Sequence, residues 1–548
     1  MTNSDKPQDE SFVFRKHDSI GSAAAEDDAK FLEECFIDTG DLDQLIDCKN
    51  PRRIIVGRTG AGKSALIYML RERSSHVIEL SPHSLSLNFI ANNNVIAFFE
   101  TAGVNLSIFY GLLWKHILVV ELLKKKFNIV NEDAHKDYMR NIRSILYKKD
   151  RIKEQAVDYL EKWGDKFWLT TEERIHELTE RIERNLSGSI GGEFAGIKLN
   201  AEGAKNLTTE QKKEVIERGQ RAVSEVQIRE LENMIAVLSD NIFNDSKDHY
   251  YVTIDMLDEE WTDDQIRFKL IRSLIDTIRH FRKIVNVKVI AVLRKDLLNK
   301  ILNQDPAPGF QEEKYESLYL NISWTKKDLL QLIERRINYL IKRKYTKADV
   351  PFDSIFPSTI DKESTIAYLC DRTFLRPRDI IMFINECLQM CEGRTSISGA
   401  IIKQAEDGYS RKRLQSLATE WRIIYPNLIH VARLFYGMKC HIEVSEITRE
   451  FIDEYYPEII SGIKDTSIDP ITRALDSLYT PNANFNSVRG YVLGELYITG
   501  LIGIKTGPSS STSWAYQMAV TPSLGEIRPS SIIQIHPMFY HALGISVN

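Results

Sequence analysis

The feature that most constrains the fold is the segment GRTGAGKS, residues 57–64, which fits the pattern G-x-x-x-x-G-K-[ST]. A strand-like run, RRIIV, precedes this segment, and a helix-like run, SALIYMLRER, overlaps its end. Glycines let the backbone N–H groups of such a loop curl around a phosphate, and the following helix directs the positive end of its dipole at the same anion. The sequence therefore predicts a phosphate-binding loop between a strand and a helix of an α/β fold.

The residue types in this loop predict their roles. Lys63 supplies a mobile positive charge for the β- and γ-phosphates, and the Ser64 hydroxyl is a ligand suited to Mg²⁺. The predicted cofactors are therefore ATP and Mg²⁺. The residues expected to bind the nucleotide are Gly57, Thr59, Gly60, Ala61, Gly62, Lys63, Ser64 and Ala65.

A second strand is expected at YYVTI, residues 250–254, because its β-branched and aromatic residues are typical of a buried strand. Asp255 follows directly, at the end where open parallel sheets bind their ligands. We predict that Asp255 completes the Mg²⁺ shell. Glu259 is expected to orient or deprotonate the attacking water, with Asp258 as the alternative base.

Two arginines are further candidates for the catalytic site. Arg294 ends an almost continuously apolar run, residues 285–293, which predicts a strand buried on both faces. It would sense the γ-phosphate or stabilise developing charge, or else form a surface pair. Arg376 precedes Pro377, which favours a helix start. It would reach the phosphates from a second domain, or form a structural salt bridge.

The segment TKKD, Thr325 to Asp328, matches the T/N-K-x-D pattern with which GTPases read guanine. Thr325 is equally a good N-cap, and the residues after it have apolar side chains at helical spacing, with Asp328 in the first turn. No D-x-x-G follows Asp255. We therefore expect ATP rather than GTP.

The chain between the phosphate-binding loop and Asp255 is far longer than a compact βαβ unit requires, so the core carries an insertion. The expected organisation is a flexible N-terminal tail, an ATPase core with a helical insertion at about 105–245, a helical lid and a winged-helix-like C-terminal domain. Residues 186–206 within the insertion predict a small β-hairpin. The boundaries are 1–30 for the tail, 31–324 for the core, 325–410 for the lid and 411–548 for the last domain.

Together with the loop, the segments IDMLDEEW, VLRKDLL and FLRPRDIIMFIN resemble AAA-type and STAND-type P-loop ATPases, the latter KAP- or NACHT-like. The ensemble is similar to a bacterial family of AAA-like P-loop ATPases. The resemblance implies a parallel-sheet P-loop NTPase core in a predominantly helical chain, and fits a role in anti-phage defence. The sequence departs from ordinary AAA proteins in having no acidic residue directly after Asp255.

Composition limits the partners. The net charge is −5, the hydrophobic fraction is 43%, and six cysteines in 548 residues do not form a disulfide framework. Cys387 and Cys391 are expected in the core.

The N-terminus lacks a signal-peptide pattern, and the most apolar long segment, around Lys115 and His116, is too short to cross a bilayer comfortably. We expect a cytoplasmic protein without membrane contact.

Two functions remain open from the sequence alone. In the first, the chain is an ATP-driven switch or assembly module that acts as a homo-oligomer, on a protein effector, or both. In the second, it is a DNA- or RNA-dependent motor or loader that uses the winged-helix-like domain. The helix before the expected wing carries Arg489 as an isolated positive charge, so that helix is not strongly basic.

Overall fold

The computed structural model divides the chain into two compact units. The first unit comprises residues 1–39, 58–64 and 323–548, and the second comprises residues 40–57 and 65–322. The description covers residues 12–85, 87, 93–128, 184, 187–188, 198–225, 234–245, 247–259, 261–262, 264–303, 313–344, 349–461, 469–481, 483–507, 509–517 and 525–547. Residues 198–206 of the predicted hairpin are described, and Ala201–Lys205 forms helix α10 there, so that part of the prediction is wrong. Phe194 and Ile197 of the predicted hairpin, with much of the predicted insertion, lie outside the described residues.

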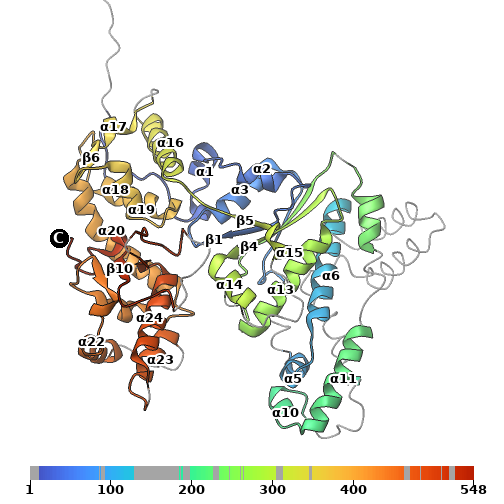
Figure 1. Ribbon diagram of the computed structural model, residues 1–548. Coiled ribbons are helices and arrows are strands. Elements are labelled where there is room, and N and C mark those ends of the chain that lie inside the picture. The colour runs from blue at the N-terminus through green and yellow to red at the C-terminus, as the bar shows by residue number, and fades with distance from the viewer. Residues whose placement is uncertain are drawn as a thin grey trace, which may run out of the picture. The chain divides into compact units, whose positions relative to one another are not determined.

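The second unit is built on a parallel sheet of five strands, in the order β2-β3-β4-β1-β5 (Figure 1). Most side chains of β3 and β4 are apolar and buried, as expected for strands covered on both faces, and the buried exceptions are Thr253 and Lys288. The strands are β1 (Ile54–Gly57), β2 (Val77–Leu80), β3 (Tyr250–Ile254), β4 (Val287–Arg294) and β5 (Tyr319–Asn321). Because the strands are parallel, their carboxyl ends lie along one edge of the sheet. The predicted α/β core with a parallel sheet is confirmed.

Helices of the second unit pack on this sheet and on one another. Helix α6 packs along α13, and the Trp114 indole N–H donates to the Leu270 carbonyl at 2.9 Å. The helices are α2 (Asp41–Ile46), α5 (Asn94–Ala102), α6 (Ser107–Phe127), α10 (Ala201–Lys205), α11 (Thr209–Glu225), the π-helical η3 (Leu238–Ile242), α13 (Asp264–Phe281), α14 (Lys295–Asn303) and α15 (Glu313–Glu316). Helix α3 (Lys63–Arg73) begins in the first unit and continues in the second.

The first unit is largely helical. The segments before β8, including most of the predicted lid, are η1 (Ala25–Asp27), α1 (Ala29–Cys35), α16 (Lys326–Lys344), α17 (Phe352–Ile355), α18 (Thr365–Asp371), α19 (Pro377–Gln389), α20 (Gly399–Glu420), α21 (Leu428–Val431) and η4 (Ala432–Phe435), with the short strands β6 (Thr359–Ile360) and β7 (Glu363–Ser364). Cys387 and Cys391 are fully buried here, as predicted. Within the described residues, no group of His, Cys, Asp and Glu is arranged to hold a metal ion.

The C-terminal part of this unit holds an antiparallel sheet of three strands, in the order β8-β10-β9. Helix α24 ends at Thr499, and Gly500 caps it in the left-handed region at φ 88°. The elements are β8 (His441–Glu443), η5 (Val444–Glu446), α22 (Arg449–Ser461), α23 (Pro470–Ser477), α24 (Phe485–Thr499), β9 (Ile502–Lys505), β10 (Ile532–Ile535) and η6 (Pro537–Phe539). A helix followed by two antiparallel strands is the arrangement that the winged-helix interpretation assumes, and that interpretation stays a prediction.

The N-terminal segment differs from the flexible tail predicted over residues 1–30. Phe14 is buried, and its backbone N–H donates to the Arg394 carbonyl at 2.8 Å. Asp28 forms a fully buried ion pair with Arg336 of α16. Residues 12–30 are therefore packed against the helical unit, so the predicted tail is too long. The sequence offered no local sign of this, because each partner lies hundreds of residues away.

Among the described helices, none combines the length and the apolar character needed to cross a membrane. The apolar segment around Lys115 and His116 forms α6, which lies in the core of the second unit.

Candidate nucleotide site

The predicted phosphate-binding loop connects the end of β1, at Gly57, to the start of α3, at Lys63. Gly60 and Gly62 adopt left-handed backbone conformations, with φ of 78° and 98°. A Cβ added at Gly60 would lie 2.7 Å from the Cβ of Arg378, so both the conformation and the close packing require glycine at that position. This backbone is the kind of curled cradle that phosphate binding needs.

The loop carries polar groups that suit the phosphates of a nucleotide and the metal ion bound to them. The Lys63 ammonium donates to the Arg58 carbonyl at 3.1 Å, and the Trp324 indole N–H donates to the Ala61 carbonyl at 2.9 Å. The Thr59 hydroxyl is buried and has no hydrogen-bond partner among the described residues. The glycine cradle, the lysine within the loop and the spare hydroxyl together fit the phosphates of a nucleotide.

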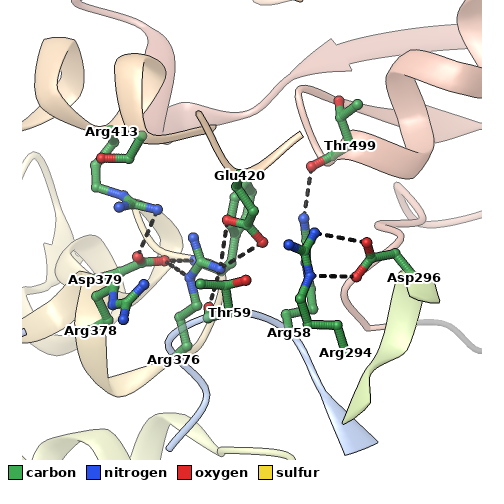
Figure 2. Close-up of polar contacts among 12 residues, drawn as sticks. Arg58, Thr59, Arg294, Asp296, Arg376, Arg378, Asp379, Arg413, Glu420 and Thr499 are labelled. Atoms are coloured by element: carbon green, nitrogen blue, oxygen red, sulfur yellow. Dashed lines mark hydrogen bonds and ion pairs between the residues drawn. The ribbon is translucent and has the colours of Figure 1, made fainter. Parts of the chain in front are cut away.

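Arg376 approaches the loop from helix α19. Its guanidinium donates to the Thr59 carbonyl and to the Asp379 carboxylate, the latter at 2.8 Å, and pairs with Glu420 at 3.3 Å (Figure 2). Arg413 contacts the other oxygen of Asp379 at 3.1 Å. Arg376 thus forms the salt bridges of its second suggested role, and its role toward the phosphates stays a prediction.

The electrostatics of this network follow from its burial. Burial alone would raise the pKa of the Asp379 carboxyl, but the guanidiniums of Arg376 and Arg413 outweigh that effect and lower it below its ordinary value. Burial likewise disfavours the charged form of Arg376, and the carboxylates of Asp379 and Glu420 reverse this and raise its pKa. Arg376 and Asp379 are therefore both ionised at neutral pH, and their ion pair holds the start of α19 against the loop.

Asp255 lies where the sequence placed it, directly after β3 at the carboxyl edge of the sheet. Its backbone N–H donates to the Leu80 carbonyl at 3.1 Å, and its Oδ1 accepts the Met256 N–H at 2.7 Å. The backbone of Met256 has a φ of 61°, in the left-handed region that residues other than glycine rarely adopt. A carboxylate at this edge has the oxygen donors that Mg²⁺ prefers.

The structure distinguishes Glu259 from Asp258. Glu259 is half exposed, and its Oε2 lies 3.1 Å from Nε2 of His83. The Arg267 guanidinium also donates to the Glu259 carbonyl at 2.8 Å. The Asp258 carboxylate instead faces Arg294, with 3.8 Å between the two side chains.

Arg294 ends β4 and pairs in register with Gly57, the first glycine of the loop, so it lies at the expected edge. Its guanidinium forms two hydrogen bonds with Asp296, at 3.1 and 2.8 Å. Two carboxylates therefore hold it, which agrees with the alternative that Arg294 forms a local pair. Its predicted role toward phosphate stays a prediction.

The TKKD segment is a helix cap. The Thr325 N–H and hydroxyl both donate to the Asp328 carboxylate, at 2.9 and 2.6 Å, and the Asp328 N–H donates back to the hydroxyl at 3.2 Å. This reciprocal pattern is a capping box at the start of α16. Asp328 is thus engaged in the cap, which favours ATP over GTP.

Three contributors to the site were not anticipated from the sequence. Asp379 lies three residues after Arg376, which is the spacing between an N-cap residue and the third residue of its helix, and this spacing could have revealed the pair. His83 follows β2, so the argument that located Asp255 at a strand end would also have located it. The contact of Trp324 with the loop had no signal in the sequence.

A parallel sheet, a glycine-rich phosphate-binding loop after β1 and an acidic residue after β3 together define an α/β P-loop nucleotide-binding core. Residues 327–418 match the family described as the FunZ-associated C-terminal helical domain. The chain is also 24% identical to the putative transposon gamma-delta 80.3 kDa protein of Escherichia coli K12, over 98% of this chain and 68% of that protein.

Two solved structures align with most of this chain at low TM-scores. One is a Walker-type ATPase of Pyrococcus abyssi, with 13% identity and a TM-score of 0.35, covering 88% of this chain and 94% of that one. The other is the ORC2 protein of Aeropyrum pernix, with 11% identity and a TM-score of 0.37, covering 97% and 96%. At such low similarity neither structure transfers a function, which has to be argued from the residues of this chain.

Proposed function

We propose that this chain binds and hydrolyses ATP with Mg²⁺ and uses the cycle as a switch that controls a protein partner. The observation that carries the proposal is the loop at residues 57–65. Its left-handed glycines form the cradle, and Lys63 hydrogen-bonds within it. A loop of this geometry at the carboxyl edge of a parallel sheet serves phosphate binding.

The residues have separate tasks in this proposal. Lys63 binds the β- and γ-phosphates through its ammonium group. Mg²⁺, held by Ser64 and Asp255, would supply positive charge against the phosphate oxygens. Glu259 accepts a proton from the attacking water, because its carboxylate is half exposed and reachable by solvent. Its pairing with His83 orients that carboxylate.

The switch is supported by the way the helical unit holds the loop. Helix α19 reaches Thr59 through Arg376, and α24 reaches Arg58 through the Thr499 carbonyl. A change in loop conformation on nucleotide binding therefore bears directly on both helices. An effector would respond to that movement, and its identity, the oligomeric state and a role in anti-phage defence stay predictions.

The alternative, a nucleic-acid motor, has less support from the C-terminal part. Arg489, the positive charge expected on the reading helix, is buried and donates to the carbonyls of Val444 and Ile447 at 2.9 and 3.0 Å. It is thus committed to the interior, which agrees with the expectation that this helix is not strongly basic. In the described part of the insertion, the basic residue Lys126 pairs with Asp248 at 3.6 Å.

The test measures ATP turnover and molar mass by light scattering, with and without DNA. In Glu259→Gln with ATP, we expect a mass different from that of the nucleotide-free protein, unchanged by DNA. ATP turnover accelerated several-fold by DNA at constant mass would establish the motor instead. Absence of turnover in wild type under every condition would reject the hydrolase.

A further inference from the structure

Met256, the residue after the proposed metal ligand Asp255, has a backbone conformation that its residue type disfavours. Its φ of 61° lies in the left-handed region, where the Cβ of an L-residue comes too close to the following carbonyl oxygen. Packing of the side chain does not account for this conformation, because Met256 is 45% exposed. The explanation lies in the groups that the backbone of Met256 contacts.

The backbone of Met256 contacts both carboxylate residues of the proposed site. Its N–H donates to Oδ1 of Asp255 at 2.7 Å, and its carbonyl accepts the N–H of Glu259 at 3.3 Å. The first contact fixes the orientation of the Asp255 carboxylate. The second closes a turn after β3. Met256 is thus linked through its backbone to the proposed metal ligand and to the proposed base.

This turn determines where Glu259 lies. A chain that stayed extended after Asp255 would carry Glu259 about 13 Å further along the strand direction, at about 3.3 Å per residue. The turn instead keeps Glu259 at the carboxyl edge of the sheet, where its carboxylate lies 3.1 Å from His83, a residue that follows β2. The left-handed conformation therefore places the proposed base at the same edge as the proposed metal ligand.

The residues on both sides hold Met256 in this conformation. The N–H of Asp255 extends the pairing with β2, because it donates to the Leu80 carbonyl at 3.1 Å. Leu257 is fully buried, and its carbonyl accepts the indole N–H of Trp261 at 3.3 Å. A disfavoured backbone conformation persists where the surrounding structure determines it, and such conformations concentrate at functional sites.

We propose that Met256 is a positioning residue, whose left-handed backbone orients Asp255 for Mg²⁺ and returns Glu259 to the attacking water. The inference deepens the proposed function and rests on it. It assigns the role to the backbone at position 256 and not to the methionine side chain. A residue that permits a positive φ should therefore retain the reaction, and a residue that forbids it should slow metal-dependent turnover without affecting the phosphate-binding loop.

The experiment compares Met256→Gly with Met256→Pro, because both remove the side chain and they differ in the backbone they permit. Glycine adopts a positive φ readily, whereas proline fixes φ near −65° and has no N–H for Asp255. The proline removes no ladder hydrogen bond of the sheet, since the Met256 N–H donates to the Asp255 carboxylate. ATP turnover of the full chain is measured against Mg²⁺ concentration, and mant-ATP binding is measured in EDTA.

We expect kcat of Met256→Pro to be about 10²-fold below that of Met256→Gly, which is the effect of a misplaced catalytic group. The half-activating Mg²⁺ concentration should be at least fivefold higher in the proline variant. Binding of mant-ATP in EDTA should be the same in both variants, because the phosphate-binding loop is unchanged. A general loss of structure would weaken this binding as well, and circular dichroism would detect it.

Met390→Gly is the matched control, because Met390 is also an exposed methionine but has an ordinary φ of −96°. Its kinetics should equal those of wild type. If Met256→Pro does not fold, Met256→Val takes its place, because a β-branched residue is strongly disfavoured at positive φ.

Two results overturn the inference. One is equal turnover and equal Mg²⁺ dependence in the glycine and proline variants. The other is a loss in Met256→Gly as large as that in Met256→Pro, which would assign the role to the side chain. If wild type itself shows no turnover that depends on Mg²⁺, the proposed function has failed, a result that is distinct because it appears without any variant.

Discussion

Arg376 donates a hydrogen bond to the backbone carbonyl of Thr59, so that helix α19 holds the phosphate-binding loop from outside. The contact is to a backbone group, which means that its geometry depends on the conformation of the loop and not on the identity of the side chain at position 59. In the proposed switch, a ligand that reshapes the loop acts on α19 through this contact. This relationship is the structural basis for regarding the helical unit as a reporter of nucleotide state.

Glu259→Gln tests the assignment of the base. The amide keeps the shape of the carboxylate but cannot accept the proton of water, so we expect ATP binding to persist while turnover falls by about 10²–10⁴-fold. Steady-state hydrolysis and equilibrium binding separate the two effects. Asp258→Asn is the paired comparison, because Asp258 faces Arg294. If Asp258→Asn shows the large loss and Glu259→Gln does not, the roles are exchanged.

Asp379→Asn tests the buried network. The substitution leaves the guanidiniums of Arg376 and Arg413 without their shared carboxylate, and breaking a buried pair of this kind costs about 3–5 kcal/mol. Chemical denaturation should show that loss. The pKa of Asp379 is lowered in the folded chain, so its contribution to stability is present above the ordinary Asp value and is lost as pH falls below it. A change below 1 kcal/mol would show that the network is dispensable.

His536 predicts a pH dependence in the C-terminal domain. It is fully buried among aromatic rings, and that burial lowers its pKa to about 3. Between that value and 6.5 the unfolded chain binds a proton that the folded chain does not, so stability falls as pH decreases through this window. At pH 5 the loss is about 2 kcal/mol relative to neutral pH. His536→Phe should flatten this part of the curve of unfolding free energy against pH, and an unchanged slope would contradict the assignment.

Asp328→Ala separates the cap from the guanine-reading alternative. Loss of a capping carboxylate costs about 1 kcal/mol. We expect that small loss of stability and an unchanged preference for ATP over GTP in competition binding. A shift in base preference of tenfold or more would restore the reading of TKKD as a guanine site.

Local chemistry determined which features could be predicted from the sequence. The loop, the strand before Asp255 and the helix start at Pro377 are each encoded within about twenty residues, and all three are present. The strand order, the pairing of Arg376 with Glu420 and the burial of Arg489 depend on residues far apart in the chain. A single sequence shows which residue types are available for such contacts, but it does not show which residues contact each other.

The difference is clearest for the two arginines near α19 and α24. Arg376 was a candidate because Pro377 marks the start of a helix, a local signal. Arg58 had no such signal, because its position in the loop motif accepts any residue, and its partner is a backbone carbonyl. Every residue has a backbone carbonyl, so a contact to this group places no requirement on the side chain of the partner residue.

The central claim is that the loop binds the phosphates of ATP, and isothermal titration of ATP with Mg²⁺ into wild type and Lys63→Ala tests it most directly. The account predicts saturable binding by wild type. It predicts at least a tenfold loss in the variant, because the phosphates lose their mobile cation. Circular dichroism of the two proteins should coincide, since Lys63 hydrogen-bonds within the loop. Equal affinity for ATP in both proteins would contradict the assignment of the site.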